Sequence, residues 1–445
     1  MYDTVSQYDQ VLSNELTDWH PPVMVRLWQL LHPLAAGTAP MFVVQVALYA
    51  LAFALIVAAL VRSGRPFAAA ACGVLAVSPL LLGWQMVVLK DCQMLGALIA
   101  AVGIVAHYRL ALRPVPSIAA AIAAPLIAYA TLVRANAVFA TAPLVVLLLP
   151  RPRSMAGRGV LALAAIVALV LVSPYFDHRV FGAEPSGVEK SLPVFDLAAI
   201  ADATPSSPSS FTPAERAEIV RRHCVKAYFW DPLGDPNACG PATGRLKEES
   251  DRTLYVEWGR DVAAHPIAYA EHRLKHWNST ERWLVPSNLQ EAAPPDEAEA
   301  NDLGLKTPSN LLMPAWQSVA AAEAGTPLGW PIVWTVIALL ILLIAWRRRD
   351  EEAARLAVAL IASVLTLEAS FLVVSIASDI RYHLWSMAAS ALALVLLSDD
   401  FRVSRREAIV GSAVIVLVVS GGLLTRWSLP RAPDSYEAMI LAPSG

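Results

Sequence analysis

Ten apolar runs, separated mostly by short polar connections, constrain the fold of this chain more than any other feature. A membrane-spanning helix needs about 20 predominantly apolar residues. The runs that reach or approach this length cover residues 39–61, 66–89, 92–108, 114–133, 135–150, 159–176, 326–346, 356–378, 382–398 and 408–425. Only 16% of all residues are charged, against about 25% in soluble domains. We therefore predict a mainly α, polytopic helical membrane bundle.

Basic residues alternate along the connections between these runs. Every second connection is rich in arginine, at Arg62 and Arg65, Arg109 and Arg113, Arg151, Arg153 and Arg158, residues 347–349, and Arg402, Arg405 and Arg406. The short connections between them carry only Lys90, Arg134 and Arg381. Because cytoplasmic loops are enriched in Lys and Arg, we expect the first set to be cytoplasmic and the second set to lie outside.

The same pattern predicts the organisation of the chain into five segments. They are an extracytoplasmic first loop with an interfacial helix (1–38), a bundle of about six spans (39–176), an extracytoplasmic insert domain (177–328), about four further spans (329–425) and an outer tail (426–445). In the first loop, Pro21-Pro22 favours the start of an amphipathic interfacial helix at 23–34. In the insert, Thr212-x-x-Glu215 is a capping-box sequence, and a second helix is expected near 266–284.

The four cysteines fall into two groups. Cys72 and Cys92 lie in or beside apolar runs and are interpreted as small core residues. Cys224 and Cys239 lie in the insert. If the insert faces an oxidising compartment they can form a disulfide, but two cysteines define no framework, so pairing and free thiols both stay open.

Ionisable residues at the predicted outer face indicate where chemistry would occur. The short outer connections hold Lys90-Asp91, Arg134 with Asn136, and Asp379-x-Arg381-Tyr382-His383, and the first loop adds Asp3, Asp9 and Asp18-Trp19-His20. Charges near a membrane are costly, so they suggest function or pairing. Such a group fits a reaction on a lipid-linked anionic substrate, since Arg or Lys can hold a phosphate and a carboxylate can take a proton from a hydroxyl.

A purely structural explanation stays open for each residue. Arg134 could extend its charge to the interface from a helix end, Lys90 could pair with Asp91, and Arg381 could pair with Asp379. Glu368, inside an apolar run, would either have a buried partner or line a substrate cavity. His20 could serve only to start the helix that follows, and Asp9 and Glu15 are interpreted as solvated.

Other kinds of site lack support in the sequence. It contains no Gly-rich phosphate loop, no paired CxxC and no HExxH motif. His272 and His276 have the i,i+4 spacing of metal ligands, but no third ligand is near, and no metal site is assigned. The net charge of −3 gives no reason to expect a nucleic-acid partner.

The outer-face residues resemble the GT-C superfamily of glycosyltransferases. An acidic residue followed by Asp18-Trp19-His20-Pro21-Pro22 is similar to the first outer loop of protein O-mannosyltransferases and of the aminoarabinose transferases of lipid A. Asp91 after Lys90 resembles the acidic residue of the second outer loop in that superfamily. Arg381-Tyr382 resembles a late Arg-Tyr at the outer start of a helix. The resemblance in topology covers most of the chain, whereas the motifs themselves are short.

The resemblance implies transfer of a sugar, with inversion, from a polyprenyl-phosphate donor to an acceptor outside the cytoplasm. Asp3 would then be the catalytic base and Asp91 a second acidic site residue. Lys90, Arg134 and Arg381 would hold the phosphate, while His20, Asn136 and Tyr382 would shape the substrate site. No cofactor is certain, and a divalent cation is left open. The partners would be the lipid-linked sugar, membrane lipids and an acceptor that the sequence does not identify. The protein would lie in a bacterial plasma membrane, with its active site on the outer face.

Family members carry a transmembrane helix directly before the acidic residue of the first loop. Here the sequence starts two residues before Asp3, so the resemblance implies one more helix, either upstream of this start or lost from a truncated product. Two other classes of function stay open. One is a transporter or flippase of lipid-linked sugars, and the other is a non-catalytic membrane protein of envelope assembly. The absence of an internal repeat and the gathering of charges at one face count against transport.

Overall fold

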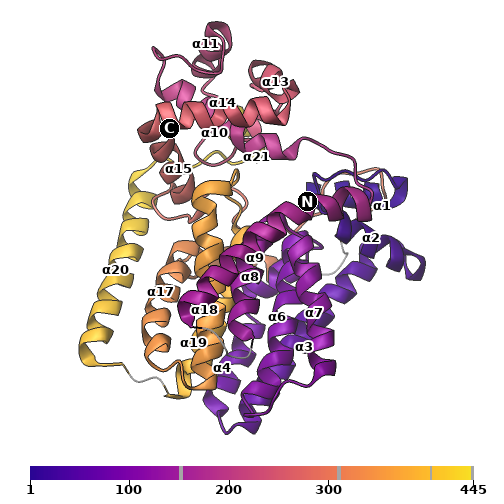
Figure 1. Ribbon diagram of the computed structural model, residues 1–445, viewed down its shortest axis with the longest axis vertical. Helices are drawn as coiled ribbons and strands as arrows, with labels where there is room; N and C mark the ends of the chain where they lie inside the picture. Colours follow the sequence, from indigo (N-terminus) through magenta and orange to yellow (C-terminus); the bar gives the residue numbers. More distant parts are fainter. Residues whose placement is uncertain (150–153, 308–311, 401–402, 442–445) are drawn as a thin grey trace. The chain divides into compact units, whose positions relative to one another are not determined.

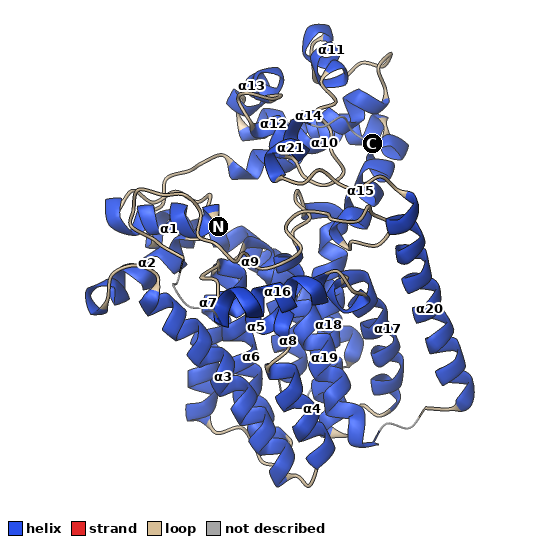
Figure 2. Cartoon of the chain, turned by 180° about the vertical axis from the view of Figure 1, so that it is seen from behind, coloured by secondary structure: helices blue, strands red, loops and turns tan. Residues whose placement is uncertain are grey.

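The computed structural model describes residues 1–149, 154–307, 312–400 and 403–441, and all its regular elements there are helices. Helices make up 73% of the described residues, which form no strand, only two isolated β-bridges (Figure 2). The predicted mainly α class is therefore confirmed. The chain forms two compact units, unit 1 (Met1–Pro185, Ala292–Glu368 and Ile380–Leu417) and unit 2 (Ser186–Glu291, Ala369–Asp379 and Val418–Gly445).

Unit 1 contains the long apolar helices and the N-terminal segment. Its helices are α1 (Tyr2–Ser13), α2 (Pro22–Leu31), α3 (Ala39–Arg62), α4 (Pro66–Ala76), α5 (Pro79–Gln85), α6 (Lys90–Arg109), α7 (Ser117–Leu132), α8 (Val138–Leu148), α9 (Met155–Tyr175), α16 (Leu312–Ala324), α17 (Pro331–Arg347) and α19 (Leu384–Leu397), with most of α18 (Glu352–Val374) and the first half of α20 (Arg405–Ser428). A short 3-10 helix, Ile380–His383, precedes α19. The predicted interfacial helix corresponds to α2, which begins at Pro22 after an extended Pro21.

Unit 2 holds residues 186–291 of the predicted insert, whereas residues 177–185 and 292–328 belong to unit 1. Its helices are α10 (Ser191–Ala203), α11 (Pro213–Arg221), α12 (Asp231–Gly234), α13 (Gly240–Glu248), α14 (Asp251–Ala264), α15 (Pro266–Thr280) and α21 (Tyr436–Leu441). The predicted capping box is confirmed, since Thr212 and Glu215 each accept the other's backbone N–H at the start of α11. The second expected helix is α15, which ends four residues earlier than predicted.

Six helices in the described part of the chain are long and apolar enough to cross a membrane. They are Ala39–Arg62, Lys90–Arg109, Met155–Val180, Glu352–Val374, Ile380–Leu397 and Arg405–Ser428. The helices at Ser117–Leu132, Ala135–Leu148 and Pro331–Arg347 are apolar but shorter. On α9 most apolar side chains are exposed, with Leu163 63% and Leu171 74% accessible, whereas Ile166 is buried. Exposed apolar helix faces of this kind are found where helices contact lipid or another protein.

The run at 66–89, predicted as one span, is broken in the structure. α4 and α5 meet at an angle of 51°, because Pro79 starts a new helix and holds Ser78 outside the helical conformation, at φ −54° and ψ 127°. The start of α5 is stabilised by Glu323 of α16, whose carboxylate accepts a hydrogen bond from the backbone N–H of Leu80 at 2.9 Å. The two helices count as a seventh span only if they are taken together as one bent span.

α3 packs closely against α6, the helix that begins with the predicted site residues Lys90 and Asp91, and the two lie side by side in Figure 1. Glycines of α6 face the backbone of α3, and a Cβ built on Gly103 would lie 2.9 Å from the carbonyl oxygen of Ala52. Small residues allow helices in a membrane to approach in this way. Cys72 and Cys92 are both buried, which confirms their interpretation as core residues.

Gly103→Ala is expected to destabilise unit 1, because the added methyl group must push α3 away from α6. The expected cost is roughly 1–3 kcal/mol, the usual range for overpacking. Gly73→Ala in α4 is the matched control, since a Cβ there meets nothing within 4 Å and should stabilise the helix by up to about 1 kcal/mol. Melting temperatures of the full chain in detergent would test both, and equal values for the two variants would contradict the packing argument.

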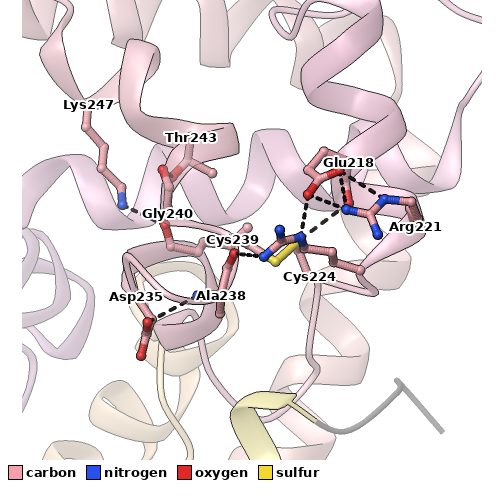
Figure 3. The surroundings of a disulfide bond; sticks show 11 residues. Glu218, Arg221, Cys224, Asp235, Ala238, Cys239, Gly240, Thr243 and Lys247 are labelled. Atoms are coloured by element: carbon pink, nitrogen blue, oxygen red, sulfur yellow. Dashed lines mark hydrogen bonds and ion pairs between the residues drawn. A yellow bond between two sulfur atoms is a disulfide. The ribbon is translucent and has the colours of Figure 1, made fainter.

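The core of unit 2 is built around α10 and includes a disulfide bond. Buried apolar residues of this core include Phe195, Leu197, Ile219, Leu246 and Leu254. Cys224 and Cys239 form a disulfide with their Cα atoms 5.9 Å apart. Figure 3 shows the joined sulfur atoms, with Glu218 and Arg221 of α11 paired beside them. The pairing that the sequence left open is therefore present in the structure.

Candidate functional site

Asp3 lies between two cations that come from distant parts of unit 1. Its Oδ2 is 2.8 Å from the Nη1 of Arg381 and 3.4 Å from the Nζ of Lys90. These side chains belong to the first turn of α1, the 3-10 helix Ile380–His383 and the first residue of α6. The structure thus brings three of the predicted site residues into direct contact.

Asp91 forms the second carboxylate centre beside the first. It is paired with Arg134, whose Nε donates a hydrogen bond of 2.7 Å to Oδ1 of Asn136. The guanidinium carbon of Arg134 lies 3.9 Å from the centre of the Tyr382 ring, the distance of a cation–π contact. The side chain of Arg134 is therefore directed into this group rather than away from it.

Arg381 connects the two centres, because its Nε is also 3.9 Å from Oδ2 of Asp91. Lys90 and Asp91, which could have neutralised each other, are instead each paired with another segment. Asp3, Lys90, Asp91, Arg134, Asn136, Arg381 and Tyr382 thus form one connected group, here called the charged cluster. Asp9 and Glu15, in contrast, are exposed.

Backbone contacts hold the elements that carry the charged cluster. The hydroxyl of Thr4, next to Asp3, donates a hydrogen bond of 2.9 Å to the carbonyl of Val88 and ties α1 to the segment before α6. Gln45 of α3 donates to the carbonyls of Gln85 and Val87, both at 2.9 Å. Asp91 lies in the first turn of α6, where the helix dipole favours a negative charge.

Neighbouring charges decide the protonation of Asp3. Burial alone would raise its pKa, but the charges of Arg381 and Lys90 outweigh burial and hold the pKa well below its usual range. Asp3 is therefore ionised at neutral pH. A carboxylate bound to two cations is a weak base, so any role as a base requires that these cations first take another partner.

His20 is held at the charged cluster by the loop between α1 and α2. Backbone hydrogen bonds join this loop to another segment of unit 1, from the N–H of Asp18 to the carbonyl of Glu184 and from the N–H of Glu184 to the carbonyl of Leu16. The His20 side chain is 1% exposed. Burial, together with the charge of Lys90, lowers the pKa of His20 to about 4, so its imidazole is neutral at pH 7.

Glu368 and His383 form a buried pair in the bundle. Oε2 of Glu368 lies 2.8 Å from Nδ1 of His383, and both side chains are almost fully buried. The sequence left open whether Glu368 had a partner or lined a cavity, and the structure supplies the partner. Because His383 follows Tyr382 directly, this pair anchors the segment that carries Arg381 to α18.

An apolar cavity of about 640 Å³ opens beside the charged cluster in unit 1. Its lining includes Thr4 next to Asp3, and Val88 two residues before Lys90, although neither Asp3 nor Lys90 itself lines it. Most of the other lining side chains are apolar, among them Phe42, Leu82, Met86, Leu305, Met313 and Trp316. Its polar lining includes acidic residues at 296, 297 and 299 and the cation Lys306.

One buried residue near Asp3 was missed by the sequence reasoning. Gln7 lies one helical turn after Asp3 in α1 and is fully buried, with 0% exposure. Neither its Nε2 nor its Oε1 has a hydrogen-bond partner among the described residues. The i,i+4 spacing from Asp3 could have indicated that Gln7 shares its helix face.

His272 and His276, considered as a metal pair, have other partners in unit 2. Nε2 of His272 lies 3.3 Å from Oδ1 of Asp196, and Nδ1 of His276 lies 2.7 Å from the carbonyl oxygen of Ala227. Nη2 of Arg273 lies 2.5 Å from the same Oδ1 of Asp196. Within the described ranges, no group of three His, Cys, Asp or Glu residues is arranged to hold a metal ion.

His276 is expected to make the stability of unit 2 depend on pH. Burial, with the charge of Arg273, lowers its pKa to about 3, against about 6.5 in an unfolded chain. Between these values the unfolded state binds a proton that the folded state does not, so the free energy of unfolding should fall as the pH is lowered from about 6.5 towards 3.

Denaturation of the full chain in detergent at several pH values would measure this slope. His276→Gln, which can still donate to the carbonyl of Ala227, should flatten it. His265→Gln, at a half-exposed position before α15, should leave it unchanged. An identical slope in wild type and His276→Gln would show that another group carries the acid sensitivity.

The charged cluster combines two carboxylates with three cations beside an apolar cavity. Arg and Lys in this arrangement can bind a phosphate or pyrophosphate, and a carboxylate released from them can accept a proton. No family model, curated protein or solved structure matches the chain. The geometry of the charged cluster therefore carries the functional argument.

Proposed function

We propose that the protein is a GT-C-like membrane glycosyltransferase. It would move a sugar, with inversion, from a polyprenyl-phosphate donor to an extracytoplasmic acceptor. The observation that carries this proposal is the contact of Asp3 with both Arg381 and Lys90, beside the pair of Asp91 and Arg134. These are a candidate base and candidate phosphate ligands within reach of one sugar-phosphate, as the reaction requires.

The ion pairs suggest how donor binding would activate Asp3. A donor phosphate attracts Arg381 and Lys90, and its negative charge offsets theirs. The influence that holds the pKa of Asp3 down then weakens, and the pKa rises. The carboxylate becomes a stronger base only when the donor is in place, so that it accepts the proton of the acceptor hydroxyl as the sugar leaves the phosphate.

The cavity beside the charged cluster fits the lipid part of such a donor. Its mostly apolar lining, in a volume of about 640 Å³, suits a hydrocarbon chain whose phosphate lies at the cations. The six helices that are long and apolar enough to cross a membrane support a membrane location. The disulfide of Cys224 and Cys239 supports an oxidising compartment for unit 2, in keeping with an extracytoplasmic insert.

A transfer assay tests the proposal directly. The full chain in detergent would be given undecaprenyl phosphate carrying radiolabelled mannose, galactose or arabinose, and release of the label to water or to added membrane extract would be measured. Wild type should release label from at least one donor. Arg381→Gln should lower kcat/KM by roughly 100-fold, the usual loss when one partner of a buried charge pair is removed.

Arg113→Gln is the matched control, because Arg113 is an exposed arginine outside the charged cluster. It should keep the wild-type rate. Failure of wild type to release label from any donor, or equal rates for Arg381→Gln and wild type, would contradict the proposal.

A transporter of lipid-linked sugars is the second candidate, and one observation favours it. Glu368 and His383 form a buried ionisable pair within two of the candidate spans, and such pairs occur in proton-coupled transporters. Movement of the labelled lipid across a vesicle membrane without loss of its sugar would favour transport over transfer.

A further inference from the structure

Two buried polar side chains beside Asp3 have ring or amide atoms without partners. Nε2 and Oε1 of Gln7, and Nδ1 and Nε2 of His20, make no hydrogen bond to any described residue. Gln7 is 0% exposed and His20 is 1% exposed. A buried polar atom without a hydrogen bond costs roughly 1–3 kcal/mol, so each such atom needs an explanation, usually a ligand or a water.

Both side chains lie near Asp3. Gln7 lies four residues after Asp3 in α1, on the same face of the helix. The ring centroid of His20 lies 6.5 Å from that of Tyr2, the residue before Asp3, and the charge of Asp3 also acts on the pKa of His20. Neither residue takes part in the ion pairs of the charged cluster, and no hydrogen bond among the described residues uses these polar atoms.

The chemistry of these atoms differs from that of the charged cluster. The cations offer donors and positive charge, which match phosphate oxygens. Gln7 and the neutral imidazole of His20 each offer both a donor and an acceptor without charge. Sugar hydroxyl groups also donate and accept, so they can satisfy all four atoms in a way that a phosphate cannot.

We propose that Gln7 and His20 form the sugar-recognition subsite, binding hydroxyl groups of the sugar next to the lipid phosphate. This inference rests on the proposed function and goes further, because it assigns the residues that distinguish a glycosylated lipid phosphate from a bare one. Hydrogen bonds to substrate hydroxyls discriminate strongly, since a ligand that lacks the hydroxyl leaves buried polar groups unpaired.

A binding experiment separates recognition of the sugar from recognition of the phosphate. Undecaprenyl phosphate, bare or carrying mannose, galactose or arabinose, would be titrated into the full chain in detergent. Wild type should bind at least one glycosylated lipid more tightly than the bare lipid. Gln7→Leu and His20→Leu should each lower the affinity for that glycosylated lipid by roughly 10- to 100-fold and leave the affinity for the bare lipid unchanged.

Gln10→Leu is the matched control on the same helix. Gln10 is also a buried glutamine, but its Oε1 accepts a hydrogen bond of 3.2 Å from the backbone N–H of Thr17. This variant should lower the melting temperature and keep the sugar preference. Gln7→Leu should keep or raise the melting temperature without ligand, because it removes unpaired polar atoms from a buried position.

The outcomes distinguish this inference from the proposed function. If wild type binds none of the lipid phosphates, both are overturned. If wild type binds them but shows no sugar preference, or if both leucine variants keep that preference, the subsite is overturned while the lipid-phosphate site stands. Each leucine variant reports on the preference independently, so misfolding of one leaves the test to the other.

Discussion

Replacing Asp3 by asparagine is expected to lower kcat for sugar transfer by roughly 10²- to 10⁴-fold, the contribution typical of a general base. Asparagine keeps the shape of the side chain but cannot accept the proton of the acceptor hydroxyl. Release of radiolabelled sugar from the lipid donor measures the effect. Asp9→Asn, at an exposed position of the same helix, should leave kcat unchanged.

The pH dependence gives a second check on this role. Because Arg381 and Lys90 hold the pKa of Asp3 below its usual range, the protein without a donor keeps Asp3 ionised in mildly acidic solution. Protonation of Asp3 should therefore not limit kcat/KM at mildly acidic pH. As the pH is lowered, kcat, which reports on the donor complex, should begin to fall at a higher pH than kcat/KM does. Full activity of Asp3→Asn would show that another group accepts the proton.

Arg273→Met is expected to destabilise unit 2 by roughly 3–5 kcal/mol, the cost of leaving a buried carboxylate without its cation. Asp196 is 0% exposed, and Arg273 lies 2.5 Å from it while donating a hydrogen bond of 2.7 Å to the carbonyl of Ser375. Such a loss corresponds to a fall in melting temperature on the order of 10 °C, measurable by thermal denaturation in detergent.

A double variant distinguishes an unpaired charge from lost packing. Arg273→Met combined with Asp196→Leu removes both charges and should recover much of the stability, as in other buried pairs replaced by apolar residues. Arg221→Met, which breaks an exposed pair with Glu218, should leave the melting temperature unchanged. A double variant less stable than Arg273→Met would contradict this account.

Local features of the fold were predictable because neighbouring residues determine them. Thr212 and Glu215 form their capping box from a spacing of three residues, and α15 starts at a proline. The apolar runs became helices because their composition leaves few alternatives. The break between α4 and α5 has an equally local cause in Pro79, a residue that could have been used to predict it.

Partners within the charged cluster were not predictable from the sequence. The sequence identified the charged residues of the outer connections, since ionisable groups are rare beside apolar runs. It could not show that Arg381 would reach Asp3, which is 378 positions away. Nor could it show that Lys90 and Asp91 would pair with different segments, which happens because adjacent residues at the start of a helix point in different directions.

The sequence by itself determined the helical class, the apolar segments and the set of residues able to carry chemistry, because composition and short spacings decide these. Only the tertiary structure decided that Asp3 is ionised between two cations, that Asp91 pairs with Arg134, and that Gln7 is buried with no hydrogen-bond partner in the described part of the chain. Each of these depends on which distant segments pack together. Packing alone determines the distances between charges and the exclusion of water, and these two quantities govern the chemistry of the charged cluster.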